Sequence, residues 1–265
     1  MSVFKDQLQR VFLTNGVPKR IVSLVPSQTE LLCDLGLENT IVGITKFCVH
    51  PNHLLSEKTI VGGTKQVHYD KIIALQPDII LCNKEENAKG MIPDLEKITP
   101  VHISDIYTIE DSLELIAMYA ELFNTAEKAK IIIEGIKKSK SEFEDFIAIK
   151  PIKTVAYFIW KSPWMVAGND TFINHLLLQN GLDNLYSNIE RYPEIDINNI
   201  KIKPDLVFLS SEPYPFKKDH IEEFKTYFPE SKIILVDGEM FSWYGSRLLK
   251  AFDYFKALRE TYCYY

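Results

Sequence analysis

The strongest constraint on the fold is a repeat inside the chain. Residues 21–39, IVSLVPSQTELLCDLGLEN, give an apolar strand, a turn, a short helix and then Gly-Leu-acid-Asn, and residues 154–184 follow the same plan. A second pair of similar segments, IIALQPDIILCN at 72–83 and NIKIKPDLVFLS at 199–210, places Pro-Asp before an apolar strand. Because whole structural units recur, the sequence indicates a duplicated architecture. We therefore predict two similar lobes with a groove between them.

Strands that alternate with helices along the chain are typical of parallel α/β sheets. Between the two copies lies a proline-free stretch whose apolar residues recur at helical spacing, which predicts one long helix. The predicted fold is α/β, with two parallel-sheet lobes joined by one long rigid connecting helix. We assign residues 1–124 to an N-terminal α/β lobe, 125–150 to the connecting helix and 151–265 to a C-terminal α/β lobe.

Composition excludes several classes of protein. A formal charge of -6 without a basic stripe argues against nucleic-acid binding. No apolar run approaches the ~20 residues of a membrane span. Charged residues at the start interrupt any signal-peptide core, so we expect a periplasmic protein if a leader was removed and a cytoplasmic one if Met1 is the native start. The scattered cysteines, Cys33, Cys48, Cys82 and Cys263, predict reduced thiols.

Local signals predict one hairpin and one helix cap. Residues 3–19 are expected to form a hairpin closed by Asn15-Gly16. Ser27 stands three residues before Glu30, the spacing of a capping box at a helix start. Ser27 also lacks the G-x-S-x-G context of a nucleophile, so a capping role is preferred to a catalytic one.

Histidines offer weak evidence for a metal. His50 and His53 could share an ion with His68, but no thiolate or carboxylate stands at a fixed spacing from them, so no metal site is predicted. We interpret His102, together with His175 and His220, as a surface or edge residue. No motif indicates catalysis, and an enzyme is the least favoured alternative.

Aromatic residues gather where a ligand would bind. In open parallel sheets, ligands lie outside the carboxyl ends of the strands. The loops predicted there are rich in aromatic residues and carry few charges, and all three tryptophans fall in loops of the second lobe. Aromatic side chains give large, rigid contact areas, which suits a flat or bulky ligand.

The order of several segments resembles a known family. RIVSLVPSQTELLCDLGL, TIVGITKFCVHP, VGGTK, IIALQPDIILC and MFSWYGSRLLKAFDYF resemble segments of the substrate-binding proteins of ABC importers for cobalamin and ferric siderophores, the helical-backbone metal receptors with a class III periplasmic-binding-protein-like fold. The resemblance covers nearly the whole chain. It implies a binding protein and not an enzyme, with no covalently bound cofactor and with a metal chelate held between two lobes.

The resemblance also implies particular ligand contacts. The positions that line the pocket of cobalamin-binding members correspond to Ser27, Phe47, His50, Asn83, Trp160, Trp164, Tyr192, Phe241 and Trp243. Anionic catecholate siderophores call for an arginine cluster, whereas only Arg191 and Arg247 are near. A corrinoid such as cobalamin is therefore the preferred ligand, ahead of another ferric chelate, with haem or a bare metal bound through His50 as alternatives.

Partners follow from the same resemblance. Family members present one acidic residue on each lobe to the membrane subunit of the importer, and the candidates here are Glu85 and Glu86 in the first lobe. In the second lobe the matching position is nearest Asn198, and Glu194 and Asp196 lie close by, so Glu194 is the candidate. We expect a monomer that docks on an ABC importer, or alternatively an intracellular relative that is not coupled to one.

Overall fold

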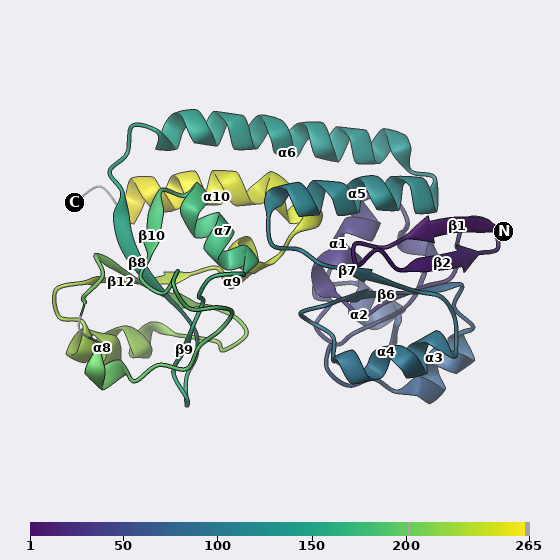
Figure 1. The fold of residues 1–265 in the computed structure, drawn as a ribbon, viewed down its shortest axis with the longest axis horizontal. Coiled ribbons are helices and arrows are strands. Elements are labelled where there is room, and N and C mark those ends of the chain that lie inside the picture. Colours follow the sequence, from purple (N-terminus) through teal and green to yellow (C-terminus); the bar gives the residue numbers. More distant parts are fainter. Residues whose placement is uncertain (201, 263–265) are drawn as a thin grey trace. The chain divides into compact units, whose positions relative to one another are not determined.

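The computed structural model describes residues 1–200 and 202–262, so Cys263 lies outside the described residues. The chain forms two compact units. Unit 1 contains Met1–Ile136 and Tyr244–Arg247, and unit 2 contains Lys137–Trp243 and the chain from Leu248 onward. Each unit holds its own parallel sheet, which confirms the predicted α/β class with two lobes (Figure 1).

The boundary between the units falls inside a long helix, α6 (Ala126–Ile147). The three-part division at residues 124 and 150 stays a prediction. None of the described helices combines the length and the apolar character needed to cross a bilayer.

Unit 1 is a five-stranded parallel sheet with helices on both faces (Figure 1). Its strands stand in the order β5 (Thr59–Ile60), β4 (Ile41–Ile44), β3 (Ile21–Ser23), β6 (Ile79–Asn83) and β7 (Val101–Ser104). The helical segments of unit 1 are α1 (Pro26–Asp34), η1 (Glu38–Thr40), α2 (Leu54–Glu57), α3 (Tyr69–Leu75), η2 (Lys89–Met91), α4 (Ile92–Glu96), α5 (Ile109–Phe123) and η4 (Gly245–Arg247).

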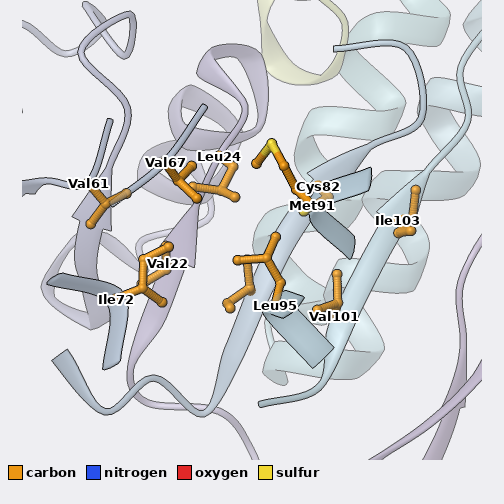
Figure 2. Packing of buried hydrophobic residues seen from close by; sticks show 11 residues of the cluster. Val22, Leu24, Val61, Val67, Ile72, Cys82, Met91, Leu95, Val101 and Ile103 are labelled. Carbon is orange, nitrogen blue, oxygen red and sulfur yellow. The ribbon is translucent and has the colours of Figure 1, made fainter. Parts of the chain in front are cut away.

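Two clusters of apolar side chains fill unit 1. Figure 2 shows the cluster under α3 and α4, where Ile72 and Leu95 meet strand residues such as Val22 and Ile103. On the other face, Tyr119 of α5 lies against β7. Strands covered on both faces need apolar side chains in both directions, which explains the uninterrupted apolar runs in the sequence.

Unit 2 has the sheet order β10 (Leu182–Asn184), β8 (Lys153–Trp160), β11 (Leu206–Ser210) and β12 (Lys232–Val236), with β9 (Met165–Val166) antiparallel to β8. Its helical segments are α7 (Phe172–Gln179), η3 (Ile197–Asn199), α8 (Lys218–Tyr227), α9 (Gly238–Ser242) and α10 (Leu248–Tyr262). Phe224 of α8 packs on Phe158 from one face, and Phe255 of α10 belongs to an aromatic cluster on the other.

The repeat is present in the strand order of both sheets. When the two-residue edge strand β5 is left aside, each unit has four parallel strands, which are β3, β4, β6 and β7 in unit 1 and β8, β10, β11 and β12 in unit 2. Numbered along the chain, both sets stand in the order second, first, third, fourth. Gly36 and Gly181 end the equivalent helices with φ of 78° and 62°, a left-handed conformation that favours glycine.

Both Pro-Asp motifs fasten the strand that follows them to its neighbour in the sheet, β6 to β3 in unit 1 and β11 to β8 in unit 2. Asp78 Oδ2 accepts hydrogen bonds from the backbone N–H groups of Lys19 and Arg20 at 2.7 and 2.9 Å. Asp205 Oδ2 accepts from the Thr154 N–H and hydroxyl at 2.7 and 2.9 Å. The hydrogen bonds from Thr154 hold the pKa of Asp205 below its usual value. The recurring Asp therefore has a structural role at the strand starts.

Two local predictions were wrong. The hairpin of β1 (Ser2–Lys5) and β2 (Val11–Thr14) is closed by the turn after Asp6, whose Oδ1 accepts from two turn N–H groups, so Asn15-Gly16 follows the hairpin. Helix α1 begins at Pro26 with Val25 as its cap residue, and no side chain caps it. Proline is well suited to the first helical position, and it displaces Ser27 into the helix.

The prediction for His102 was also wrong. This residue of β7 is 1% exposed, and its ring lies 5.3 Å from that of Tyr119 and 5.9 Å from that of Phe12. Neither ring nitrogen has a hydrogen-bond partner among the described residues. Burial lowers the pKa of His102 to about 3, and the nearby Arg10 adds to this effect.

Candidate ligand-binding site

In unit 1 the predicted ligand contacts come from loops at the carboxyl ends of three neighbouring strands. Ser27 lies in α1 after β3, Phe47 and His50 follow β4, and Asn83 ends β6. Since β4, β3 and β6 are adjacent and parallel, these loops share one edge of the sheet. The side chains differ in how far they are available to a ligand.

Phe47 is the most exposed of these four side chains. Its side chain is 48% exposed although it is large and apolar. The ring rests beside Gly63, where an added Cβ would come within 3.2 Å of it, and the Lys46 ammonium lies 5.0 Å from the ring centre. The loop thus presents one aromatic face with a cation beside it, while His50 is half-buried in the same loop.

A buried polar network lies beneath this edge. Gln28 Nε2 donates to Ser104 Oγ at 2.6 Å and to the Tyr244 hydroxyl oxygen at 2.9 Å, and Gln28 Oε1 accepts from the Tyr119 hydroxyl at 2.7 Å. Ser27 is 2% exposed and its side chain lies beside the Tyr244 hydroxyl. Burial raises the pKa of Tyr119 and of Tyr244. Gln28, Ser104, Tyr119 and Tyr244 fix one another, so the network supports this edge of the sheet.

Asn83 shapes the loop that carries the acidic pair. Its Nδ2 donates to Ser104 Oγ at 3.0 Å, and its Oδ1 accepts from the N–H groups of Glu85 and Glu86 at 2.8 and 3.0 Å. The side chain is 3% exposed. Asn83 therefore positions Glu85 and Glu86, both half-buried, and does not present its amide to a ligand.

Unit 2 presents aromatic rings at the corresponding edge of its sheet. Trp160 ends β8 and is 39% exposed, and its ring meets that of Tyr214 edge-on at 5.7 Å. Tyr214 belongs to the loop after β11, the strand beside β8. Trp160 and the half-buried Tyr214 together form an accessible aromatic surface, of which sequence reasoning identified only Trp160.

Trp243 is held by the carboxylate of Glu212, a residue that no sequence motif pointed to. Its Nε1 donates to Glu212 Oε1 at 3.0 Å, and the Ser242 hydroxyl donates to the same oxygen at 2.6 Å. Burial raises the pKa of Glu212, and these two hydrogen bonds oppose the rise. Trp243 is 7% exposed, and its indole N–H is held by the half-buried Glu212 carboxylate.

Two predicted contacts take part in the packing of unit 2. Phe241 is fully buried, with its ring 5.3 Å from that of Tyr157 and 4.8 Å from that of Phe255. Its assignment to the binding surface does not agree with this position, because one side of α9 faces the core. Trp164 lies edge-on to Phe224 at 5.0 Å and covers the cluster beneath α8.

The remaining predicted residues of unit 2 lie in one long loop between β10 and β11. Tyr192 is half-buried, and the Arg191 guanidinium lies 5.7 Å from its ring centre. Glu194 is exposed and forms a bridge pair with Met165 of β9. The loop therefore carries both an aromatic and an acidic candidate.

A shallow hollow of about 740 Å³ lies elsewhere on unit 1. Pro77, two residues before the start of β6, is among its lining residues, so the hollow is at the edge where strands begin. The exposed Asp94–Lys97 ion pair forms part of its wall. Ligands of open α/β sheets bind at the opposite edge, so we do not assign the ligand to this hollow.

Comparison with known families gives a match over most of the chain. A profile described as periplasmic binding protein matches residues 21–230. An uncharacterized ABC transporter substrate-binding lipoprotein of Bacillus subtilis is 28% identical over 168 residues, which is 60% of this chain and 53% of that protein. The match thus spans about half the length of that relative.

Two further proteins match over larger shares of their length. The vitamin B12-binding protein of Vibrio campbellii is 26% identical over 212 residues, 74% of this chain and 72% of that protein. Among solved structures, a periplasmic haem-binding protein of Pseudomonas aeruginosa superposes with a TM-score of 0.81 at 20% identity, covering 91% of this chain and 92% of that one. The structural likeness shows a shared fold.

Proposed function

We propose that this chain, which belongs to the periplasmic binding protein family, is the substrate-binding component of an ABC uptake system and binds a cobalamin-like metal chelate. Membership of a family of substrate-binding proteins confirms the expectation of a binding protein and not an enzyme. The observation that carries the proposal is the pair of exposed aromatic surfaces at carboxyl strand ends, Phe47 in unit 1 and Trp160 with Tyr214 in unit 2.

The charges near these surfaces favour a corrinoid over an anionic siderophore. Arg247, one of the two arginines considered for an anionic ligand, is 5% exposed, and its Nε lies 2.9 Å from Glu30 Oε2. Its charge is therefore compensated inside unit 1. A catecholate chelate would require several uncompensated cations, whereas a corrin ring needs flat apolar contacts. The B12-binding relative supports the same choice.

A fluorescence titration tests the proposal directly. Cyanocobalamin and its base-free analogue dicyanocobinamide should each quench the tryptophan emission of ligand-free protein with 1:1 saturation. Replacing Trp160 by alanine should weaken binding by about 1–2 kcal/mol, or roughly five- to thirtyfold in Kd, because an exposed aromatic anchor loses its contact area. Isothermal calorimetry gives the same Kd without depending on the fluorophore that the substitution removes.

The matched control is Trp164→Phe. Because Trp164 packs on Phe224, this substitution should leave the Kd unchanged while altering the emission. Equal affinity of Trp160→Ala and the unaltered protein would rule out the unit 2 surface as a contact. Absence of binding by both corrinoids would reject the cobalamin class.

Haem is the second candidate ligand, and His50 favours it. This half-buried imidazole lies in the same loop as the exposed Phe47 and could serve as an axial ligand to the iron. Haemin binding with a Soret band that shifts in His50→Ala would identify this ligand. If the band does not shift in His50→Ala, His50 is not a ligand of the haem iron.

We propose that the partner is a membrane subunit of an ABC importer, which this protein meets on the outer side of the cytoplasmic membrane. Glu85 and Glu86 in unit 1 and Glu194 in unit 2 are the proposed docking residues, to be met by cations of the transporter. The relative that is a substrate-binding lipoprotein supports this placement. Charge reversal at Glu86 should lower ligand-stimulated transport without changing the Kd for the ligand.

A further inference from the structure

Three potential metal ligands gather on the surface of unit 1 away from the proposed ligand contacts. Glu38 is the first residue of η1, His53 is the cap residue of α2, and Glu57 is the last residue of α2. One ligand atom from each of the three lies within 4.8 Å of the others. The chemistry of this group differs from a simple acidic cluster, because it includes an imidazole nitrogen together with two carboxylates.

The backbone explains why these side chains meet. His53 and Glu57 are four residues apart across the single turn of α2, and side chains at this spacing share a face. Glu38 comes from a separate segment, and its Oε1 lies 2.8 Å from His53 Nε2. Two ligands that bind a metal at ~2.1 Å and are adjacent in its coordination sphere lie about 3 Å apart, so the spacing of Glu38 and His53 already suits a shared ion.

Charge and exposure at this place also suit a cation. The nearest cation is Lys58, and its ammonium donates to the main-chain carbonyl of Glu38 at 2.9 Å, so its hydrogen bond leaves the carboxylate available. The half-buried thiol of Cys33 reports the local field: burial raises its pKa to about 12, and Glu38 contributes to the rise. The side chains of His53 and Glu38 are 42% and 38% exposed, which leaves space for water ligands.

We propose that Glu38, His53 and Glu57 form a binding site for a divalent transition-metal ion. One imidazole and two carboxylates suit Zn²⁺, Co²⁺ or Ni²⁺, with waters in the remaining positions. The site is independent of the proposed chelate-binding function, since none of its residues is among the proposed ligand contacts. Glu57 is exposed, so its side chain has room to turn toward a bound ion.

Calorimetric titration of chelator-treated protein with ZnCl₂, in the absence of any tetrapyrrole, tests the site. We expect uptake of one equivalent, with an affinity that falls at least about tenfold in His53→Ala and again in Glu57→Gln. Titration with CoCl₂ should give a visible absorption band that both variants lose. These residues lie at the surface, and circular dichroism checks that each variant is folded.

Two histidine variants serve as matched controls. His68→Ala removes an exposed histidine from another part of unit 1, and His50→Ala removes the histidine that a bare-metal ligand would use. Both should retain the wild-type zinc affinity. The proposal is overturned if His53→Ala binds zinc as the unaltered protein does, or if the unaltered protein takes up no zinc at millimolar concentration.

Discussion

Replacing Arg247 by methionine is expected to lower the free energy of unfolding by about 3–5 kcal/mol. Arg247 and Glu30 are both 5% exposed, and they form a buried ion pair at 2.9 Å. Removing the guanidinium leaves the Glu30 carboxylate without its charge partner in a place that water barely reaches. Urea-induced unfolding, followed by circular dichroism, measures the loss.

A second substitution separates the pair from the packing around it. The double variant Glu30→Leu with Arg247→Met should recover most of the lost stability, because it removes the uncompensated charge. Lys97→Met, which breaks the exposed pair with Asp94, is the control and should cost less than about 1 kcal/mol. A loss of similar size in Arg247→Met and Lys97→Met would contradict the assignment of a large role to the buried pair.

The stability of the protein should fall in mild acid because of His102. The folded state keeps this histidine neutral with a pKa of about 3, whereas its pKa in the unfolded chain is the ordinary 6.5. Below pH 6.5 the unfolded state therefore binds one proton more than the folded state, and unfolding is favoured as the pH falls toward 3. The expected contribution is about 1.4 kcal/mol for each pH unit between roughly pH 6 and pH 4.

The measurement compares the pH dependence of unfolding in the unaltered protein and in His102→Leu. Leucine fills a similar volume between Phe12 and Tyr119 and cannot take up a proton, so the slope should decrease by about one proton in this pH range. If the variant folds poorly, the imidazole signals in an NMR titration give the answer instead. A His102 signal that titrates near pH 6 would contradict the buried neutral ring.

The features that repeat along the chain could be predicted from sequence because the backbone requires them locally. Gly36 and Gly181 end their helices in the left-handed conformation. Asp78 and Asp205 accept hydrogen bonds from backbone N–H groups at the strand starts. Such positions restrict the residue type strongly. The duplicated α/β class followed from them, and so did the parallel sheets.

The buried polar contacts could not be predicted, because they join residues far apart in sequence. Gln28 and Tyr244 are separated by 216 positions, and Glu30 and Arg247 by 217. No local pattern distinguishes a glutamate that caps a helix from one that meets a distant arginine. The capping-box spacing at Ser27 therefore led to a wrong interpretation of Glu30, which pairs with Arg247.

The exposed fractions of the aromatic side chains were equally hard to infer. Phe241 and Trp243 lie two residues apart in the same aromatic stretch, but Phe241 enters the core and Trp243 is oriented by Glu212. Phe47 and Trp160 remain open to solvent. Sequence position placed these aromatic residues near strand ends, and only the three-dimensional packing decides which rings remain accessible there.

Unit 1 is built from two separate stretches of the chain, and this has a consequence for the order in which it folds during synthesis. Its last segment, Tyr244–Arg247, is fastened inside it by the Gly245 N–H bond to Ser112 Oγ at 2.8 Å and by the Arg247 ion pair. During synthesis, the ribosome must therefore pass residue 247 before unit 1 has all of its parts. An N-terminal fragment ending in α6 would lack Tyr244 and Arg247, which bond to Gln28 and Glu30. Vectorial folding of this unit can be completed only after unit 2 has been almost entirely translated.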